Sequence, residues 1–257
     1  PPQASRRAIA AWEELTRIWK DGEGKVLAVA AFEYPWPGDL FALRHPGHDS
    51  LLEELFEYAE ENLVHPEKKT LRVHIYEHDE PLTAVAQRRG YEKKPEWFEE
   101  DTEFLIRGDL PQASLPEGFA IQTMANENDL ERRRKAFGRG FNHEDPNEWP
   151  SLFSCQELQR APDYRKDQDL YVVGPDGEHV SFCILWWDKC NRLGILEPVG
   201  TIPEHRRKGL ARAVVYEAIR KAAALGAARV VVGSGLEFYL AIGFEKMNRK
   251  YVWVKEF

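Results

Sequence analysis

The segment from Gly194 to Leu225 constrains the fold of this chain more than any other stretch. It opens with a short apolar run that ends at Thr201, and then passes through Pro203, three consecutive basic residues and Gly209. After Gly209, apolar residues recur at the spacing of one helical face, namely Val214, Val215, Ala218, Ile219, Ala222 and Leu225. The pattern predicts a strand, a tight loop and a helix, in that order.

The loop between this strand and this helix has the properties of an anion-binding site. A glycine lets the backbone approach a ligand closely, and the free amides at a helix N-terminus carry a partial positive charge. Arg206, Arg207 and Lys208 add full positive charge at the same place. A short basic turn is also common on solvated surfaces, so the loop alone leaves both interpretations open. It matches neither the dinucleotide loop nor the nucleotide-hydrolase loop.

The loop resembles the acetyl-CoA loop of the Gcn5-related N-acetyltransferases, or GNAT family. That loop reads Arg or Gln, two residues, Gly, one residue, and Gly or Ala, and Arg206 to Ala211 fit each constrained position. Further along, Phe238 to Phe244 resembles the family pattern of an aromatic or Leu, Tyr, three residues and Gly-Phe. Because a predicted helix and a predicted strand separate the two patterns, as in the family, the chain is identified as resembling its members.

The resemblance implies acetyl-CoA as cosubstrate, bound without a metal. Backbone groups before the loop would contact the pantetheine arm, and amides of the loop would hold the pyrophosphate. The residues implied in binding are Val199, Gly200, Thr201, Arg206, Arg207, Lys208, Gly209, Leu210 and Ala211. Ser234 is added because the short segment before Tyr239 lacks the asparagine that often contacts the cofactor in the family.

Tyr239 matches the family tyrosine that is usually assigned as the general acid near the thioester sulfur. A tyrosine hydroxyl keeps its proton at neutral pH and can donate it to a departing thiolate. The alternative is that Tyr239, like the neighbouring Phe238, is a core aromatic residue.

Glu197 is the candidate general base, because it lies on the strand that leads to the loop, where the family often has a carboxylate. It can equally be an exposed edge charge or a partner of Arg192. Trp186 and Trp187 are neighbours on a predicted strand and must face opposite ways. We therefore expect one of them at most to line a pocket, and the other to pack under the helix.

The first half of the chain reads as a degenerate copy of the second. A helix is predicted over residues 5–20, a strand over 25–32, a helix from the possible capping box at Ser50, and a strand over 70–76. The segment that ends in Gly90-Tyr91 occupies the position of Gly243-Phe244 in the second copy. Residues 44–50 lack the loop pattern, and Val85 stands where the tyrosine is expected, so this half is predicted not to bind the cofactor.

A Pro- and Gly-rich segment over residues 108–118 predicts a linker. Beyond it we predict strands over 119–124, 169–173 and 179–187 and helices over 128–137 and 149–160. The predicted fold class is α/β (α+β), with two tandem GNAT-like domains, each a mixed, mostly antiparallel sheet flanked by helices. Their expected bounds are 1–111 for the degenerate copy and 112–257 for the acetyltransferase domain.

The composition argues against several classes of binding partner and location. The 257 residues carry a formal net charge of −8, which argues against a nucleic-acid or anionic membrane surface. The apolar runs are shorter than a membrane helix requires, and no secretory signal is seen at the start. Three cysteines without close-pair spacing indicate reduced thiols and a cytoplasmic location. His143, Glu144 and Asp145 are adjacent and point in different directions, so a metal site is not predicted there.

The sequence thus predicts an N-acetyltransferase that moves an acetyl group from acetyl-CoA to a primary amine of a small molecule or peptide. The alternative is a non-catalytic GNAT-fold module that binds CoA or a partner protein. A narrower alternative is a tandem enzyme acting on a sugar-linked thiol precursor or an aminoglycoside. The polar segment 137–147 is expected to border the acceptor pocket, and the acceptor itself and the oligomeric state remain open.

Overall fold

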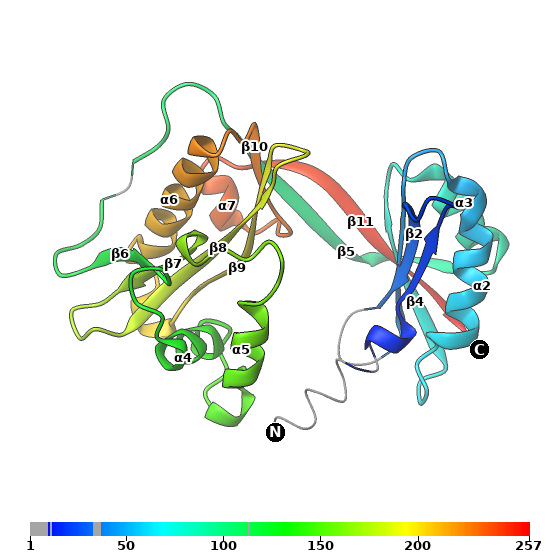
Figure 1. The fold of residues 1–257 in the computed structure, drawn as a ribbon, viewed down its shortest axis with the longest axis horizontal. Helices are drawn as coiled ribbons and strands as arrows, with labels where there is room; N and C mark the ends of the chain where they lie inside the picture. Colours follow the sequence, from blue (N-terminus) through cyan, green and yellow to red (C-terminus); the bar gives the residue numbers. More distant parts are fainter. Residues whose placement is uncertain (1–9, 11, 33–36, 113) are drawn as a thin grey trace. The chain divides into compact units, whose positions relative to one another are not determined.

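A computed structural model describes residue 10 and residues 12–32, 37–112 and 114–257 (Figure 1). The chain divides into two compact units. The first unit comprises residues 1–100 and 248–257, and the second comprises residues 101–247. Each unit is a mixed α/β structure in which most strand pairs are antiparallel and helices flank the sheet, as the sequence predicts.

The sheet of the first unit has the strand order β1-β2-β3-β4-β11. The strands are β1 (Arg17–Lys20), β2 (Val26–Ala31), β3 (Asp39–Arg44), β4 (Thr70–Tyr76) and the C-terminal end of β11 (Glu245–Glu256). Only β3 and β4 run parallel among these pairs. The turn η1 (Asp49–Leu51) and helix α2 (Leu52–Asn62) connect them, and α3 (Glu80–Arg88) follows β4.

Two local predictions for the first unit are wrong. Residues Arg17–Lys20 form a strand paired with β2 and not the end of a helix, and Trp19 is buried while Ile18 is half exposed. The alternation of a strand and the spacing of a helix both fit this short apolar pattern. Ser50 does not cap α2, because it lies inside η1 and Leu51 precedes the helix without a side-chain cap. The prediction is confirmed at residue 10 and residues 12–15, which are helical, whereas residues 5–9 and 11 lie outside the described residues.

The sheet of the second unit has the order β5-β10-β9-β8-β7-β6. Its strands are the C-terminal end of β5 (Glu92–Leu105), β6 (Ala120–Thr123), β7 (Asp169–Val173), β8 (His179–Asp188), β9 (Leu193–Thr201) and β10 (Arg229–Val232). Only β9 and β10 run parallel among these pairs, with the turn η4 (Pro203–His205) and helix α6 (Leu210–Ala224) between them. The other helices are α4 (Leu130–Gly140), α5 (Leu152–Leu158) and α7 (Glu237–Ala241), with short turns η2 (Pro146–Glu148) and η3 (Lys166–Gln168).

The core of the second unit explains the apolar pattern of α6. Five of the six predicted inward residues are fully buried against the sheet, namely Val214, Val215, Ala218, Ile219 and Ala222. Leu225 is 43% exposed, because it lies beyond the last turn of the helix as its C-cap. Helix α4 packs against Tyr171 and Phe182 on the opposite face of the sheet (Figure 1). The sheet therefore separates α6 from α4.

The two units repeat one order of elements. In the first, β3, α2, β4, α3 and β5 follow one another, and in the second, β9, α6, β10, α7 and β11 do so. The last strand of each series passes from one unit into the other: residues 102–105 of β5 pair with β10 within the second unit, and residues 250–256 of β11 pair with β4 within the first. The packing units therefore divide inside β5 and β11, whereas the domain boundary near residue 112 stays a prediction about the two copies.

Candidate active site

A cavity of about 930 Å³ surrounds the basic loop and the N-terminus of α6. All the predicted cofactor-binding residues line it except Ser234, and Tyr239 lines it too. Ser234 accepts a hydrogen bond from the amide of Leu236 through its Oγ, and its carbonyl accepts one from Thr102. The structure thus brings together strand end, loop, helix start and tyrosine, and leaves Ser234 beside the cavity wall.

The backbone of the loop leaves amides free at the start of α6. Arg207 has φ +61° and Gly209 has φ +79°, so both lie in the left-handed region, which glycine adopts without steric cost. Gly209 is the N-cap of α6, and no described side chain caps the helix there. The first turn of α6 contains Arg212 and no acidic residue. The loop thus has the local charge and geometry that suit phosphate oxygens.

Arg206 has a structural role that its position in the motif does not reveal. Its Nε donates to the carbonyl oxygen of Thr201 at 3.0 Å. Its Nη2 donates to the carbonyl oxygen of Gly140 at 3.1 Å and to Oδ1 of Asn142 at 2.7 Å. The guanidinium therefore ties the loop to the end of β9 and to the turn after α4, while Arg207 and Lys208 remain exposed.

Strand β9 extends beyond its parallel partner. The pairs between β10 and β9 end at Val231 and Ile195, and β9 continues for six residues to Thr201. Val199 and Gly200 in this extension pair with β8 on the other side and line the cavity. Backbone groups on the side of β10 are therefore placed to bind an extended ligand as an added strand would.

Two glycines of the cavity are explained by packing against Phe182. A Cβ atom on Gly200 would lie 2.4 Å from Cζ of Phe182, and one on Gly140 would lie 2.8 Å from its Cε1. Contacts this short are not tolerated, so a side chain at either position would displace the ring. Gly200 is thus required by the core of the protein itself, in addition to its place beside the cavity.

Tyr239 combines the two interpretations that the sequence leaves open. Its ring is 5% exposed and lies edge-on to Phe238 at 5.0 Å and to Phe244 at 5.4 Å. It also lines the cavity from α7, and so does Phe238, which the sequence assigns to the core. Burial raises the pKa of Tyr239 above its usual range, because the charged phenolate is disfavoured there. The hydroxyl therefore stays protonated at neutral pH.

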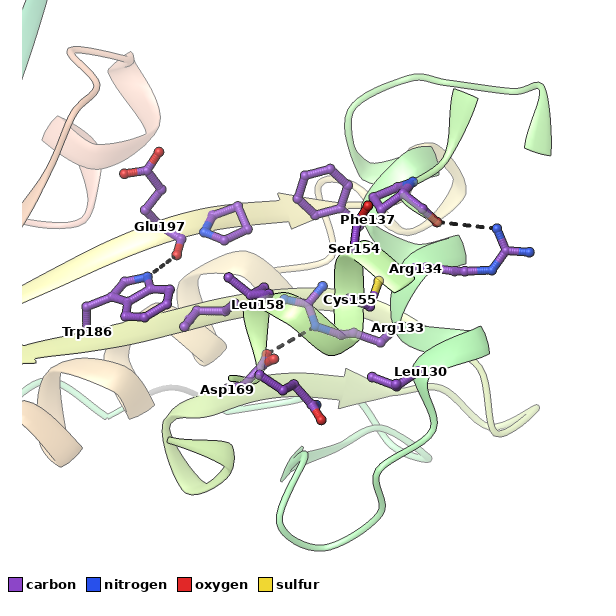
Figure 2. Close-up of a pocket in the computed structure, with 14 residues that line it drawn as sticks. Leu130, Arg133, Arg134, Phe137, Ser154, Cys155, Leu158, Asp169, Trp186 and Glu197 are labelled. Atoms are coloured by element: carbon purple, nitrogen blue, oxygen red, sulfur yellow. Dashed lines mark hydrogen bonds and ion pairs between the residues drawn. The ribbon is translucent and has the colours of Figure 1, made fainter. Parts of the chain in front are cut away.

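A second cavity of about 500 Å³ lies between α4, α5 and the strands β7, β8 and β9 (Figure 2). Glu197 and Pro198 line it, and the next residues of β9 line the first cavity. Trp186 donates from Nε1 to the carbonyl oxygen of Glu197 at 2.7 Å. The side chain of Glu197 is exposed, and Arg192, its alternative partner, donates to the carbonyl oxygen of Gly226. Glu197 and Tyr239 thus line different cavities, whose lining residues on β9 are neighbours in sequence.

The prediction for the paired tryptophans is confirmed. Trp186 lines the second cavity, and Trp187 packs against the apolar cluster that contains α6. The polar segment 137–147 is divided between the two cavities. Phe137 lines the second, whereas Gly140, Phe141 and Asn142 line the first. This segment therefore contributes to both.

Several residues of the first cavity are not found from the sequence motif. They are Gly140, Phe141, Asn142, His205, Arg212, Leu236, Ala241 and Ile242. Arg212 could have been predicted, because a basic residue in the first turn of a helix is unfavourable beside the positive end of the helix dipole unless an anion binds there. Asn142 lies in the polar segment 137–147, which the sequence predicts to border the acceptor pocket, but no sequence pattern places it beside the loop. Among the described residues, no group of three or more His, Cys, Asp or Glu side chains is arranged to hold a metal.

Comparison with known proteins agrees with the fold. Residues 131–244 match the model of the acetyltransferase (GNAT) family, and this part of the chain is a GNAT domain. The family consists generally of acetyltransferases. No curated protein matches the chain by sequence. Within the described part, no helix has the length and apolar character needed to cross a membrane.

Solved structures show the same fold at low identity. A GCN5-related N-acetyltransferase from Sphaerobacter thermophilus has a TM-score of 0.68 at 17% identity, covering 98% of this chain and 91% of that one. A tandem GNAT protein from the clavulanic acid biosynthesis pathway has a TM-score of 0.59 at 14% identity, covering 94% and 83%. Fold neighbours of this chain thus include a tandem GNAT protein.

Proposed function

We propose that the chain is an acetyl-CoA-dependent N-acetyltransferase acting on a primary amine of a small molecule or peptide. The observation that carries the proposal is a single cavity lined by the basic loop, the start of α6, the extended end of β9 and Tyr239. The second cavity is lined by Glu197 and Pro198, which precede the β9 residues of the first cavity, and we assign the acceptor to it. The three free cysteines are compatible with the expected cytoplasmic location, which is part of the proposal.

The residues divide the chemistry between the two cavities. Acetyl-CoA supplies a thioester, whose C–S bond breaks as the amine nitrogen forms a C–N bond to the acetyl carbon. Glu197 accepts a proton from the ammonium form of the acceptor, directly or through water, and the neutral amine then attacks. Tyr239 donates its hydroxyl hydrogen to the departing sulfur, and the proton that the nitrogen loses as the amide forms restores the hydroxyl. Arg207, Lys208 and the amides of the loop bind the phosphates and hold the donor in place.

The first unit lacks the features that suit phosphate. Arg44, which opens the segment equivalent to the basic loop, donates two hydrogen bonds of 2.8 Å to Asp79 and also pairs with Asp49. The first turn of α2 contains Glu53 and Glu54, which oppose an anion at that helix end. We therefore propose that this unit is a copy that does not bind the cofactor.

Acetyl-CoA is expected to bind at one site per chain. Isothermal titration calorimetry of the full chain measures this number. A stoichiometry of two would contradict the assignment of the first unit as degenerate. Absence of binding would contradict the assignment of the second unit as the cofactor site.

The enzyme is distinguished from a non-catalytic CoA-binding module by turnover. Amines of several classes, including amino acids, peptides, polyamines and aminoglycosides, are incubated with the chain and acetyl-CoA, and released CoA thiol is measured. We expect turnover with at least one class. Tight acetyl-CoA binding without turnover of any class would favour the non-catalytic module.

Glu197→Gln is expected to lower the rate at neutral pH by roughly 10²-fold, within the usual effect of one general base. The deficit should shrink as the pH rises, because an alkyl amine with a pKa of about 10 is increasingly neutral and needs no base. The pH profile of kcat/KM measures this. Glu245→Gln, at an exposed site on β11, is the control and should leave the profile unchanged. A Glu197→Gln profile that parallels the unmodified enzyme would show that the carboxylate is not the base.

A further inference from the structure

The second cavity is apolar over most of its wall. Apolar side chains contribute from α4, α5, β8 and β9, namely Leu130, Phe137, Leu158, Ile184, Trp186 and Pro198. A ligand that fills this space must therefore present an apolar body. A polyamine or an aminoglycoside, whose surface is polar and cationic, would lose hydration there without replacement.

Arg133 is the exception in this apolar setting. It is 5% exposed, its Nε donates to Oδ1 of Asp169 at 3.1 Å, and its guanidinium lies 4.4 Å from the ring centroid of Phe182. Oδ2 of Asp169 is already taken by the hydroxyl of Tyr164 at 2.8 Å. Within the described part of the chain, Nη1 of Arg133 is buried without a hydrogen-bond partner. Leaving a buried charged donor unpaired is costly, so an acceptor for Nη1 is expected from outside the chain.

Neighbouring polar groups of the cavity are already engaged. Ser154 shares a hydrogen bond with Ser151, and Gln159 donates to Asn128 and Tyr164. Nε of Arg134 donates to Glu131, and its Nη1 to the carbonyl oxygen of Pro150. Among the described residues that line this cavity, the buried donor without a partner is therefore on Arg133.

Glu197 and Arg133 lie at different ends of the cavity. In Figure 2, Glu197 and Trp186 are on one side, and Arg133 and Leu130 are on the other. The side chain of Glu197 extends away from Arg133 and Asp169 (Figure 2). A ligand with its amine at Glu197 would thus direct its opposite end toward Arg133.

We propose that the acceptor is an amine with an apolar body and an oxygen acceptor, a carboxylate or a carbonyl, at the end remote from the amine. Nη1 of Arg133 donates to that oxygen and acts as a specificity-determining residue. The proposal rests on the acetyl-transfer function proposed above, because that function places the amine at Glu197. Amino acids whose amine and carboxylate stand at opposite ends of an apolar chain or ring, and the amides of such acids, have this chemistry.

Three probes of one shape test the remote oxygen: 4-(aminomethyl)benzoate, 4-(aminomethyl)benzamide and 4-methylbenzylamine. They share amine and ring, and only the first two have an oxygen acceptor. We expect kcat/KM for at least one oxygen probe to exceed that of the methyl probe by roughly tenfold or more, the effect of one hydrogen bond from a charged donor. Preference for the benzoate alone identifies a carboxylate, and preference for both identifies a carbonyl oxygen. Equal use of all three, or faster turnover of spermidine or an aminoglycoside, overturns the proposal.

The role of Arg133 is tested by removing the donor together with its buried partner. Arg133→Met combined with Asp169→Asn avoids leaving an unpaired buried charge. The preference for the oxygen probes should fall to about one, while acetyl-CoA binding is retained. A preference that survives this change overturns the role of Arg133. If the double variant fails to fold, Arg133→Lys shifts the donor and should reduce the preference, and an unchanged preference contradicts the proposal.

The location of the acceptor is tested on α5 by a matched pair. Leu158 lines the cavity, Leu152 does not, and both are 39% exposed. Leu158→Trp should raise KM for the oxygen probe and leave the acetyl-CoA Kd unchanged, whereas Leu152→Trp should change neither. Equal effects of the two variants contradict the assignment.

Failure of the proposed acetyl transfer can be distinguished from failure of the proposed ligand class. If no amine is acetylated, calorimetry of the three probes in the presence of CoA still measures their binding to the cavity. Binding of the oxygen probes in preference to the methyl probe, lost in the Arg133 variant, supports the ligand class while the transfer reaction fails. Absence of any preference overturns the ligand class as well.

Discussion

Gly209→Val is expected to abolish acetyl-CoA binding while the second unit stays folded. Gly209 has φ +79°, where a β-branched residue is strained, and valine would turn the loop amides away from the phosphates. A Cβ atom at this position would meet only Nη2 of Arg212, at 3.8 Å, so the native packing has room for it. The expected loss thus arises from the conformation of the loop and its approach to the ligand. Calorimetry with acetyl-CoA measures it.

Gly226→Val is the matched control for this prediction. Gly226 follows the other end of α6, has φ +91°, and a Cβ atom there would have no neighbour within 4 Å. Its substitution imposes a similar backbone strain of roughly 1–3 kcal/mol away from the cavity. We expect a comparable fall in thermal stability with acetyl-CoA affinity unchanged. Unaltered affinity in Gly209→Val, or equal loss in both variants, would falsify the phosphate role of the loop.

Local patterns predict the elements around the first cavity well. The strand, loop and helix that begin at Gly194 are contiguous, and their apolar spacing reflects burial on one face of one element. The same reasoning places Trp186 and Trp187 on opposite faces, as observed. It fails at the ends of elements, where Leu225 follows the helix and Ser50 lies in a short turn.

The long-range pairings could not be predicted, because each depends on residues far apart in sequence. The strands β5 and β11 each contribute to both units, and no local pattern distinguishes pairing in one sheet from pairing in the other. The packing of Phe182 against Gly140 and Gly200 is hidden for the same reason. The buried, unpaired Nη1 of Arg133 cannot be predicted either, because its burial depends on the packing of α4 against β7.

Replacing Tyr239 is also expected to have a large effect on turnover. Tyr239→Phe keeps the ring, and with it the contacts to Phe238 and Phe244, and removes only the hydroxyl. Turnover should fall by roughly 10²- to 10⁴-fold, the usual range for one general acid, while acetyl-CoA affinity and thermal stability stay nearly unchanged. Steady-state kinetics, calorimetry and thermal unfolding measure the three quantities.

The pH dependence separates Tyr239 from Glu197. Burial disfavours the phenolate and raises the pKa of Tyr239, so its hydroxyl remains protonated between about pH 6 and 9. The deficit of Tyr239→Phe should therefore stay constant over this range, whereas that of Glu197→Gln should shrink as the pH rises. The raised pKa also makes the phenol of Tyr239 a weaker acid than a thiol. Part of the loss of turnover in Tyr239→Phe is therefore expected to come from the missing hydrogen bond to the sulfur.

Tyr216→Phe is the control for the loss of a hydroxyl in the same unit. The hydroxyl of Tyr216 donates to the carbonyl oxygen of Ile242 at 3.2 Å, and Tyr216 does not line the first cavity. Its removal should lower stability by about 1 kcal/mol and leave kcat unchanged. If Tyr239→Phe also leaves kcat unchanged, Tyr239 is a core aromatic beside the cavity, and another group must protonate the leaving sulfur. Tyr239→Phe and Tyr216→Phe each remove one hydroxyl from the second unit. If only Tyr239→Phe loses turnover, the hydroxyl that donates to the leaving sulfur is that of Tyr239 on α7.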